Sequence, residues 1–364
     1  MKDLLVTVGQ DGRTQALREF LAKLLEVGAA DALLVPAEAA PGTITHVLAR
    51  DVGLVMRAAE PLAPVMPVNA ASVVSEVVRK GPRGRVAALL RPCEMRALVE
   101  LVKLKQAAPE NILAIGIDCL GTCDPVAYRE ASGRRDDLPV REACRVCLNP
   151  TPSEAALPGI TLGFIGLDST DGIVASLSDG LDQGLAAVIE KLGLTEGEAA
   201  QRKRKEAVQA LMQERRASYD AFIKNAESAV SSSGIEAFAR ELAGCTGCHN
   251  CRVACPLCYC RECIFDTDTF EYETGQFLRR SGRKGGLKVP QDTVLYHLTR
   301  MNHMSLSCVG CGSCEAACPV HLPLFRLFAM ASRRTQAVFG YPPGRSVDDE
   351  LPFTTFREEE LEPR

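Results

Sequence analysis

The stretch CTGCHNCRVACP (Cys245–Pro256) returns later in the chain as CVGCGSCEAACP (Cys308–Pro319). In each copy, two residues separate the first three cysteines, and a fourth cysteine follows three residues later, directly before a proline. Three thiolates at this spacing fit a tight loop around one corner of a cubane cluster, whereas the fourth points away from that loop. Each copy therefore supplies the fourth ligand that the other copy lacks.

This repeated spacing is that of bacterial ferredoxins with two 4Fe–4S clusters, in which the cysteine before proline ligates the other cluster. The alternative is structural zinc, which usually takes two cysteine pairs and has no use for a repeated triplet followed by Cys-Pro. We therefore predict two 4Fe–4S clusters. One is held by Cys245, Cys248, Cys251 and Cys318, and the other by Cys308, Cys311, Cys314 and Cys255.

The insertion between the two motifs carries three more cysteines, Cys258, Cys260 and Cys263. A further cluster would need one more ligand, for which Cys123 is one option. The simpler interpretation, which we favour, is that these are buried thiols beside the clusters, because a free cysteine packs as a small hydrophobic residue.

The overall composition narrows the class of protein. The 364 residues include 16 cysteines, and the net charge is −4, which argues against a nucleic-acid binder. No apolar stretch approaches the roughly 20 residues of a membrane span, and Met1–Val6 does not open a signal peptide. We therefore expect a cytoplasmic protein, in which reduced thiols bind metal rather than form disulfides.

The N-terminal half alternates short apolar runs with helical patterns, which predicts an α/β domain with a mainly parallel sheet. The strands are expected at Ala32–Val35, Val86–Leu90, Ile112–Ile117 and Ile160–Leu167, and the helices at Arg13–Val27, Ala71–Arg79, Glu94–Lys105 and Gly197–Asn225. The basic residues between Arg279 and Lys284 are expected on a surface loop.

We expect four parts in the chain. They are an α/β flavin- and cluster-binding domain over 1–195, a helical connector over 196–240 with a break at Ser231–Gly234, an α+β ferredoxin-like two-cluster domain over 241–340, and an extended acidic tail over 341–364.

Four of the N-terminal cysteines suggest a third site. Cys93 and Cys119 each follow a predicted strand, so both should lie at the carboxyl edge of the sheet, where open α/β folds bind their ligands. Cys144 and Cys147 form a pair on a loop. Four thiolates from three segments could close one cluster over this edge, but the spacing leaves a zinc site or unrelated thiols open.

The sequence resembles the beta subunits of coenzyme F-420-linked hydrogenases and formate dehydrogenases, and most closely the formate dehydrogenase type. The resemblance rests on Pro92-Cys93, Cys119, the Cys144 and Cys147 pair, the stretch Thr293–Met301 before the second motif, and Pro343–Ser346. It implies that Cys93, Cys119, Cys144 and Cys147 hold a 4Fe–4S cluster beside FAD. It also implies that the flavin oxidises a reduced deazaflavin or reduces the oxidised form.

The flavin contacts are expected around the first helix. Where the family has Ser-Gly-Gly, this chain has Gln10–Thr14. We predict that the phosphates lie near Gly12, Arg13 and Thr14, because a helix N-terminus attracts anions. The alternative is an ordinary helix start capped by Asp11. Two further candidates for flavin contact are Asn69, which precedes a helix, and Arg91, which lies beside the cluster cysteine.

These features predict an electron-transfer subunit of an oxidoreductase. A flavin accepts a hydride and releases single electrons, which iron–sulfur clusters carry onward. The partner would be a redox subunit of the formate dehydrogenase, hydrogenase or heterodisulfide-reductase type, with a two-electron carrier at the flavin. The alternative is a flavin-free wiring subunit, in which the α/β domain is only a docking scaffold.

Docking to the partner could use two apolar segments near the C-terminal end, Pro319–Phe328 and the tail from Tyr341. The alternative is that Leu324, Leu327 and Phe328 pack inside the ferredoxin-like domain and that the tail follows its own chain.

Overall fold

The computed structural model describes residues 3–79, 81, 84–134, 138–153, 156–168, 171–178, 194–231, 234–270, 273–285 and 292–355. Its strands are β1 (Asp3–Val6), β2 (Ala32–Ala40), β3 (Thr43–Ala49), β4 (Val86–Leu90), β5 (Ile112–Ile117), β6 (Gly159–Gly163), β7 (Ile173–Leu177) and β8 (Thr195–Glu196). Its α-helices are α1 (Gly12–Glu26), α2 (Val52–Ala58), α3 (Ala70–Arg79), α4 (Pro92–Lys103), α5 (Pro125–Glu130), α6 (Glu142–Arg145), α8 (Glu198–Ser231), α9 (Gly234–Glu241), α10 (Asn250–Val253), α11 (Thr274–Lys284), α12 (Asp292–Met304), α13 (Ser313–Ala316) and α14 (Leu324–Phe339).

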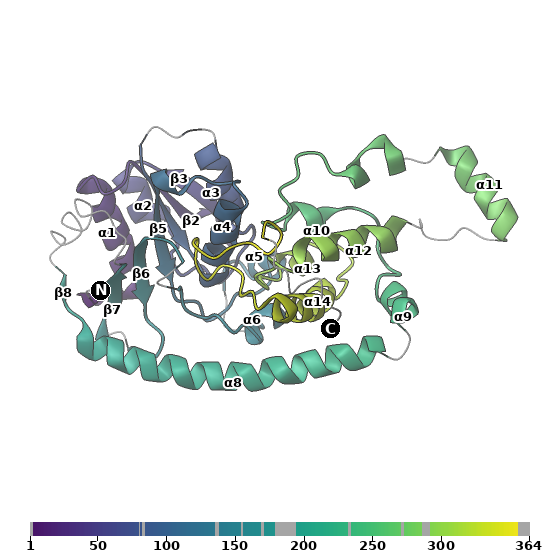
Figure 1. Cartoon of the computed structure of the whole chain (residues 1–364). Helices are drawn as coiled ribbons and strands as arrows, with labels where there is room; N and C mark the ends of the chain where they lie inside the picture. Colours follow the sequence, from purple (N-terminus) through teal and green to yellow (C-terminus); the bar gives the residue numbers. More distant parts are fainter. Residues whose placement is uncertain are drawn as a thin grey trace.

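The strands form one sheet in the order β3-β2-β4-β5-β6-β7-β1-β8, which confirms the α/β class (Figure 1). The central strands β2, β4, β5 and β6 are parallel, as expected. The strands outside them pair antiparallel, so the sheet as a whole is mixed. β3 is antiparallel because it returns from β2 as a hairpin.

Two predicted strands have the observed bounds, Val86–Leu90 and Ile112–Ile117. The strand predicted from Ala32 continues to Ala40, because the hairpin with β3 extends its ladder. The strand predicted from Ile160 ends at Gly163, four residues early. The chain turns there because the backbone N–H of Phe164 donates to the Asp118 carboxylate at 2.8 Å.

Both faces of the central sheet are covered, as an uninterrupted apolar strand such as β4 requires. Successive side chains of a strand point to opposite faces. Ala87 and Leu89 accordingly pack with α1 and α2, whereas Val86, Ala88 and Leu90 pack with α3 and α4. All five residues of β4 are buried.

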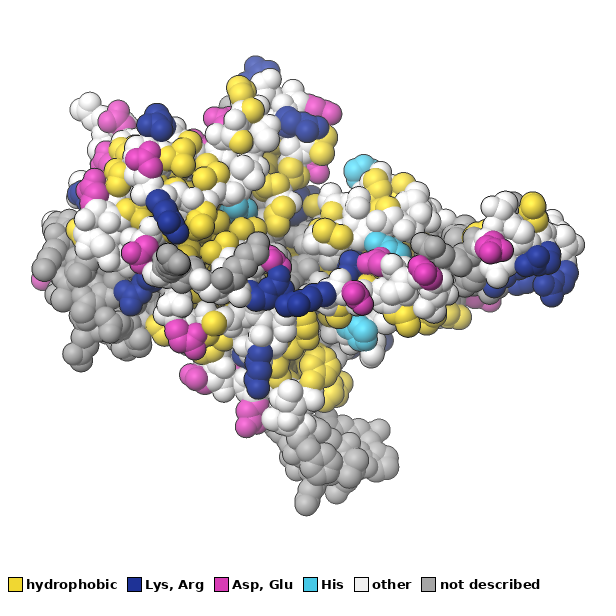
Figure 2. All heavy atoms as spheres, turned by 90° about the horizontal axis from the view of Figure 1, so that it is seen from above, with side chains coloured by type: hydrophobic (Ala, Val, Ile, Leu, Met, Phe, Trp, Pro, Cys, Tyr) yellow, Lys and Arg dark blue, Asp and Glu magenta, His cyan; other side chains and the backbone are white. Residues whose placement is uncertain are grey.

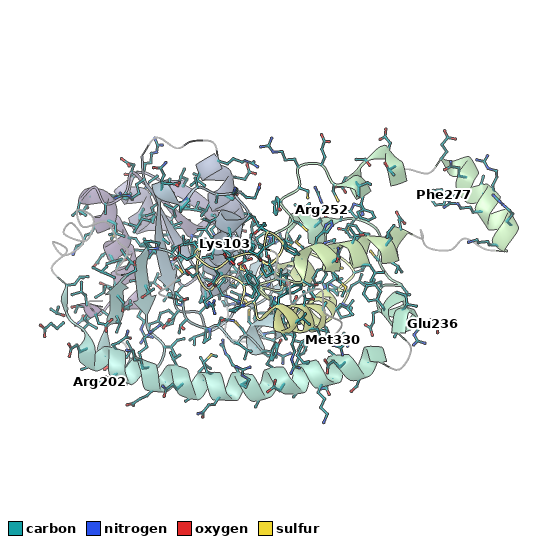
Figure 3. All side chains as sticks on the ribbon, in the orientation of Figure 1. Lys103, Arg202, Glu236, Arg252, Phe277 and Met330 are labelled. Carbon is teal, nitrogen blue, oxygen red and sulfur yellow. The ribbon has the colours of Figure 1, made fainter. Side chains whose placement is uncertain are left out.

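The long helix α8 joins the sheet to the cysteine-rich part of the chain (Figure 1). Figure 3 shows Arg202 near its sheet end and Glu236 on α9 beyond its other end. α8 contacts β1 and β7 at the first end and α14 at the second, where Phe222 stacks on Phe325 with 5.3 Å between the ring centroids. The predicted helix thus continues from Asn225 to Ser231, the first residue of the expected break, and α9 begins at the last residue of that break, Gly234.

The cysteine-rich part shares a hydrophobic core with the sheet domain. Leu98 of α4 lies in the same buried cluster as Leu257, Met304, Val309 and Phe328. Separately folded modules would each enclose a core of their own. The two parts therefore stabilise each other across a continuous apolar interface.

The apolar segment and the described part of the tail pack against their own chain. Leu324, Leu327 and Phe328 are buried in α14, as in the alternative raised from the sequence. In the tail, the Tyr341 hydroxyl donates to Glu100 at 2.7 Å, and the Gly344 N–H donates to the same carboxylate at 2.8 Å. Residues 356–364 lie outside the described part of the chain.

The basic residues expected on a loop instead form α11, which stands away from the body of the molecule (Figure 1). Its basic side chains show in the space-filling view (Figure 2). Arg283 and Lys284 lie in its last turn, where cations interact favourably with the helix dipole. Gly285 ends the helix in the left-handed conformation, with φ of 69°. No residue of α11 is buried.

Candidate functional site

The carboxyl edge of the parallel strands brings the N-terminal cysteines together. Cys93 follows β4 and Cys119 follows β5, and the two strands are parallel neighbours. Burial raises the pKa of Cys119 to about 11, and the nearby Cys144 and Cys147 thiolates act in the same direction. Burial also raises the pKa of Cys93, where Glu94, Cys119 and Cys147 contribute. The four predicted ligands are thus mutual neighbours, and we name them the edge set.

Hydrogen-bond donors surround the edge set. The backbone N–H of Gly121 donates to the Cys119 sulfur at 3.4 Å, and that of Asn149 donates to the Cys147 sulfur at 3.4 Å. Burial acts to raise the pKa of Cys144, but Arg141 and hydrogen bonds from Thr122 lower it overall. Such donors stabilise thiolates, and they tune the reduction potential of a cluster that those thiolates ligate.

Arg91 lies beside the edge set, within electrostatic reach of Cys93, Cys119 and Cys144. The Arg91 guanidinium donates to the backbone oxygens of Ala63 and Val65 at 2.7 and 2.8 Å and pairs with Glu94, so it holds the loop that precedes α3. Asn69 is fully buried, and its Oδ1 accepts from the Ala71 N–H at 3.1 Å. Its Nδ2 has no hydrogen-bond partner among the described residues. A buried donor of this kind fits a ligand that supplies an acceptor.

The first turn of α1 lies at the same edge. β1 runs in the direction of β6, because each pairs antiparallel with β7. Gly12 adopts φ of 81°, and Arg13 reaches the backbone oxygen of Leu167 in the loop after β6. Asp11 takes the N-cap position, but its carboxylate makes no capping hydrogen bond. The structure thus places Gly12, Arg13 and Thr14 at the edge that also carries the cysteines, with no side-chain cap from Asp11.

Four cysteines of the two motifs line one enclosed cavity. They are Cys255 from the first motif and Cys308, Cys311 and Cys314 from the second. This is the set that the crossed ligation pattern predicts, and we name it the middle set. Phe325, Phe328 and Arg300 line the same cavity, so its surroundings are apolar apart from one cation.

The other four motif cysteines also meet. Burial raises the pKa of Cys245, and the neighbouring thiolates of Cys251, Cys318 and Cys248 raise it further. These four form the outer set. Cys248 is exposed, whereas Cys251 and Cys318 are buried.

Aromatic and histidine side chains border the outer set. His297 Nε2 lies 3.5 Å from the Cys245 sulfur, and the Tyr296 hydroxyl lies 3.5 Å from the Cys251 sulfur. His249 stacks on Tyr296 with 4.3 Å between the ring centroids, and its Nδ1 lies 2.6 Å from the Asp266 carboxylate.

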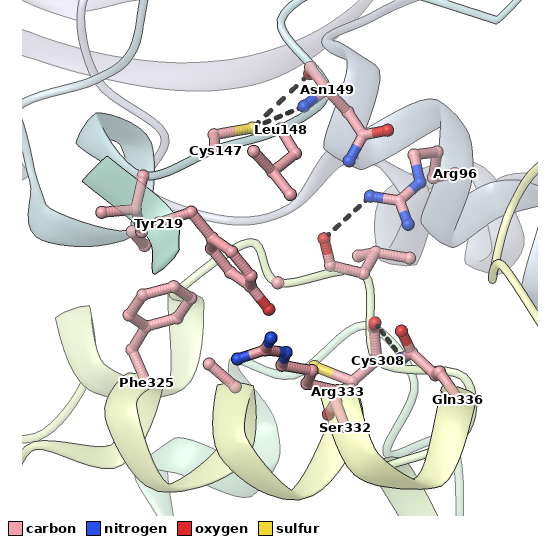
Figure 4. Close-up of a pocket in the computed structure, with 15 residues that line it drawn as sticks. Arg96, Cys147, Leu148, Asn149, Tyr219, Cys308, Phe325, Ser332, Arg333 and Gln336 are labelled. Carbon is pink, nitrogen blue, oxygen red and sulfur yellow. Dashed lines mark hydrogen bonds between the residues drawn. The ribbon is translucent and has the colours of Figure 1, made fainter. Parts of the chain in front are cut away.

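The three sets follow one another in space. The edge set lies next to the middle set, since Cys147 of the edge set and Cys308 of the middle set line one cavity. The middle set approaches the outer set through Cys314 and Cys251. Arg96 lies at the first junction, where its Nη1 donates to the Val309 oxygen at 3.1 Å (Figure 4). A cavity of about 150 Å³ there is lined by residues of both sets, including Cys147 and Cys308.

The remaining cysteines do not form a further set. Cys258 lies against Cys255, and Cys263 is half-buried beside the outer set. Cys260 is exposed, contrary to the expectation of a buried thiol. Cys123 lies in another hydrophobic cluster, where its thiol donates to the Pro64 oxygen at 3.2 Å. Across the described residues, no group of three or more Cys, His, Asp or Glu side chains is arranged to hold a single metal ion.

Comparison with known proteins finds beta subunits of formate dehydrogenases among the relatives of this chain. The chain is 27 % identical over 305 residues to the F420-dependent formate dehydrogenase 1 subunit beta of Methanococcus maripaludis, and the match covers 74 % of each protein. It is 25 % identical over 308 residues to the F420-dependent formate dehydrogenase subunit beta of Methanocaldococcus jannaschii, over 74 % of this chain and 75 % of the relative. This chain is a homologue of those beta subunits. The resemblance inferred from the motifs is confirmed.

No family model matches the chain. Among solved structures, a chain of the F420-reducing NiFe hydrogenase complex from Methanosarcina barkeri aligns with a TM-score of 0.45 and 13 % identity, over 64 % of this chain and 92 % of that one. None of the helices in the described ranges combines the length and apolarity that a bilayer span requires.

Sequence reasoning did not single out Arg96 and Arg300 as site residues. Both are arginines on helices, and arginines on helix faces are common. The available signal was that Arg300 falls in the stretch Thr293–Met301, which carries part of the resemblance.

Proposed function

We propose that this chain is the iron–sulfur flavoprotein subunit of an oxidoreductase complex, with three 4Fe–4S clusters in a row. The observation that carries the proposal is the arrangement of twelve cysteines as an edge, a middle and an outer set, each next to the following one. A row of adjacent clusters can pass electrons from one end to the other.

The chemistry of the thiols fits the clusters. Burial and mutual repulsion raise the pKa values of Cys93, Cys119, Cys245 and Cys308, so these groups become thiolates only beside a positive charge. An iron–sulfur core ligated by thiolates supplies that charge. The edge, middle and outer sets would each hold one cluster.

Two features support FAD at the carboxyl edge. The unpartnered Nδ2 of buried Asn69 can donate to a polar atom of the flavin. The N-terminus of α1 at Gly12–Thr14, which Asp11 does not cap, can receive a phosphate. When bound, a flavin accepts a hydride and releases electrons one at a time. Arg91 would act indirectly, because it holds the loop that leads to Asn69.

The division of the chain follows from this assignment. We propose a flavin- and cluster-binding domain over 1–195, a helical connector over 196–240, a ferredoxin-like domain over 241–340 and a tail over 341–364. The shared core around Leu98 and Val309 would keep the edge and middle sets at a constant separation.

The partner is proposed from the relatives. They are named as beta subunits of F420-dependent formate dehydrogenase. By analogy, we propose that this chain works in the cytoplasm with a redox subunit of the formate dehydrogenase, hydrogenase or heterodisulfide-reductase type. A two-electron carrier such as the deazaflavin would react at the flavin. The partner would accept or donate electrons at the outer set, which the exposed Cys248 brings to the surface.

Anaerobic purification tests the proposal. About 12 iron atoms per chain are expected, four for each cluster, together with one flavin visible by absorbance. About eight iron atoms per chain would rule out a cluster at the edge set, and about sixteen would indicate a fourth cluster. Twelve iron atoms without flavin would instead identify a flavin-free wiring subunit.

A further inference from the structure

Arg300 of α12 is a buried arginine between the middle and outer sets. It is 4 % exposed, and its Nη2 donates to the backbone oxygen of Cys251, an outer-set residue, at 3.0 Å. It also lines the cavity formed by the four cysteines of the middle set. One guanidinium therefore borders both places where the ferredoxin-like clusters would lie.

The remaining donors of Arg300 have no oxygen to bond. Its Nε and Nη1 are buried, and among the described residues neither has a hydrogen-bond partner. The guanidinium lies over two aromatic rings, 4.9 Å from the Phe328 centroid and 5.7 Å from that of Tyr296. A buried cation with unused donors is costly unless a negative group accepts from it.

The charges around Arg300 identify that negative group. Arg300 bonds the backbone of Cys251 in the outer set and shares a cavity with Cys255 and Cys314 of the middle set, and Cys258 also hydrogen-bonds with it. Among the described residues, no Asp or Glu lines this cavity. Cysteine side chains therefore take the place of the carboxylate that usually pairs with a buried arginine.

We propose that Arg300 is a shared counter-charge that raises the reduction potentials of both ferredoxin-like clusters together. A fixed positive charge stabilises the more negative, reduced state of a cluster, and N–H donors to sulfur act in the same direction. Because the same residue serves both clusters, the two potentials stay matched along the row. This inference rests on the proposed function and adds a positioning residue to it.

The test is an EPR-monitored redox titration of the full-length holoprotein in three forms: wild type, Arg300→Met and Arg300→Lys. In the Met variant, the reduction equilibria of the middle and outer clusters should each shift at least tenfold toward the oxidised form. For a one-electron couple, this shift lowers the reduction potential by about 59 mV. The edge cluster should keep its potential, because none of the four edge-set cysteines lines the cavity that Arg300 borders. The Lys variant should fall between the two, since it keeps the charge and loses the planar donors.

Arg252 provides a matched control on the outer-set loop. It pairs with Asp266 at 2.7 Å and donates to the Cys260 oxygen, so its charge is already balanced. Arg252→Met should shift neither cluster tenfold.

Several results would overturn the proposal. They are a shift confined to one cluster, an equal shift of the edge cluster, no shift in Arg300→Met, or loss of iron from Arg300→Lys, which would indicate a role in assembly only. Failure of the proposed function is a separate outcome, because it would already show as missing iron in the wild-type protein.

Discussion

Glu100 of α4 holds the tail to the body of the molecule. Its carboxylate accepts from the Tyr341 hydroxyl at 2.7 Å, from the Gly344 N–H at 2.8 Å and from Lys103 Nζ at 3.3 Å. The side chains of Glu100 and Lys103 are 0 % and 3 % exposed. Glu100→Ala would leave a buried ammonium without its carboxylate and two donors without an acceptor.

The size of the effect follows from this burial. Removing one partner of a buried ion pair costs about 3–5 kcal/mol. With an unfolding entropy of about 2.1 cal/mol/K per residue, that loss lowers the Tm of a chain of this length by about 4–7 °C. Differential scanning calorimetry of the holoprotein measures this lowering of Tm. Glu100→Gln should fall between Ala and wild type, because the amide oxygen still accepts hydrogen bonds.

The Arg345–Asp349 pair in the same tail is the control. It lies on the surface with 2.7 Å between the charged groups, and surface pairs contribute little. Asp349→Ala should therefore leave Tm close to wild type. A Tm for Glu100→Ala within 1 °C of wild type would refute the idea that the tail is part of the fold.

Three further results are expected. Cys93→Ser should lower iron content by about a third and leave the EPR signals of the middle and outer clusters in place; loss of all signals would mean that the shared core cannot tolerate an empty edge site. The double variant Arg13→Ala with Thr14→Ala should lower flavin occupancy, measured by absorbance, without changing iron content; unchanged occupancy would move the phosphates away from α1. Cys258→Ser should keep about 12 iron atoms, whereas Cys255→Ser should lose the middle cluster; iron loss from Cys258→Ser would make that residue a ligand.

Much of this protein could be predicted from local sequence. Ligand spacing in Cys245–Pro256 and Cys308–Pro319 is a property of short loops, so the sequence alone indicates two clusters and the crossed pattern that the middle-set cavity matches. The buried strands β4 and β5 were predicted with their observed bounds, because a run of apolar residues buried on both faces needs no distant information.

Tertiary structure decided what depends on residues far apart in the chain. The outer strands are antiparallel because of their pairing partners, which local periodicity does not encode. The tail packs on α4 because Glu100 accepts hydrogen bonds from residues about 240 positions away. Arginine is usually found at the protein surface. Arg300 becomes a buried counter-charge only because the fold places α12 between two sets of cysteines. Burial and charge environment are sums over the whole fold, and for that reason only the folded chain determines them.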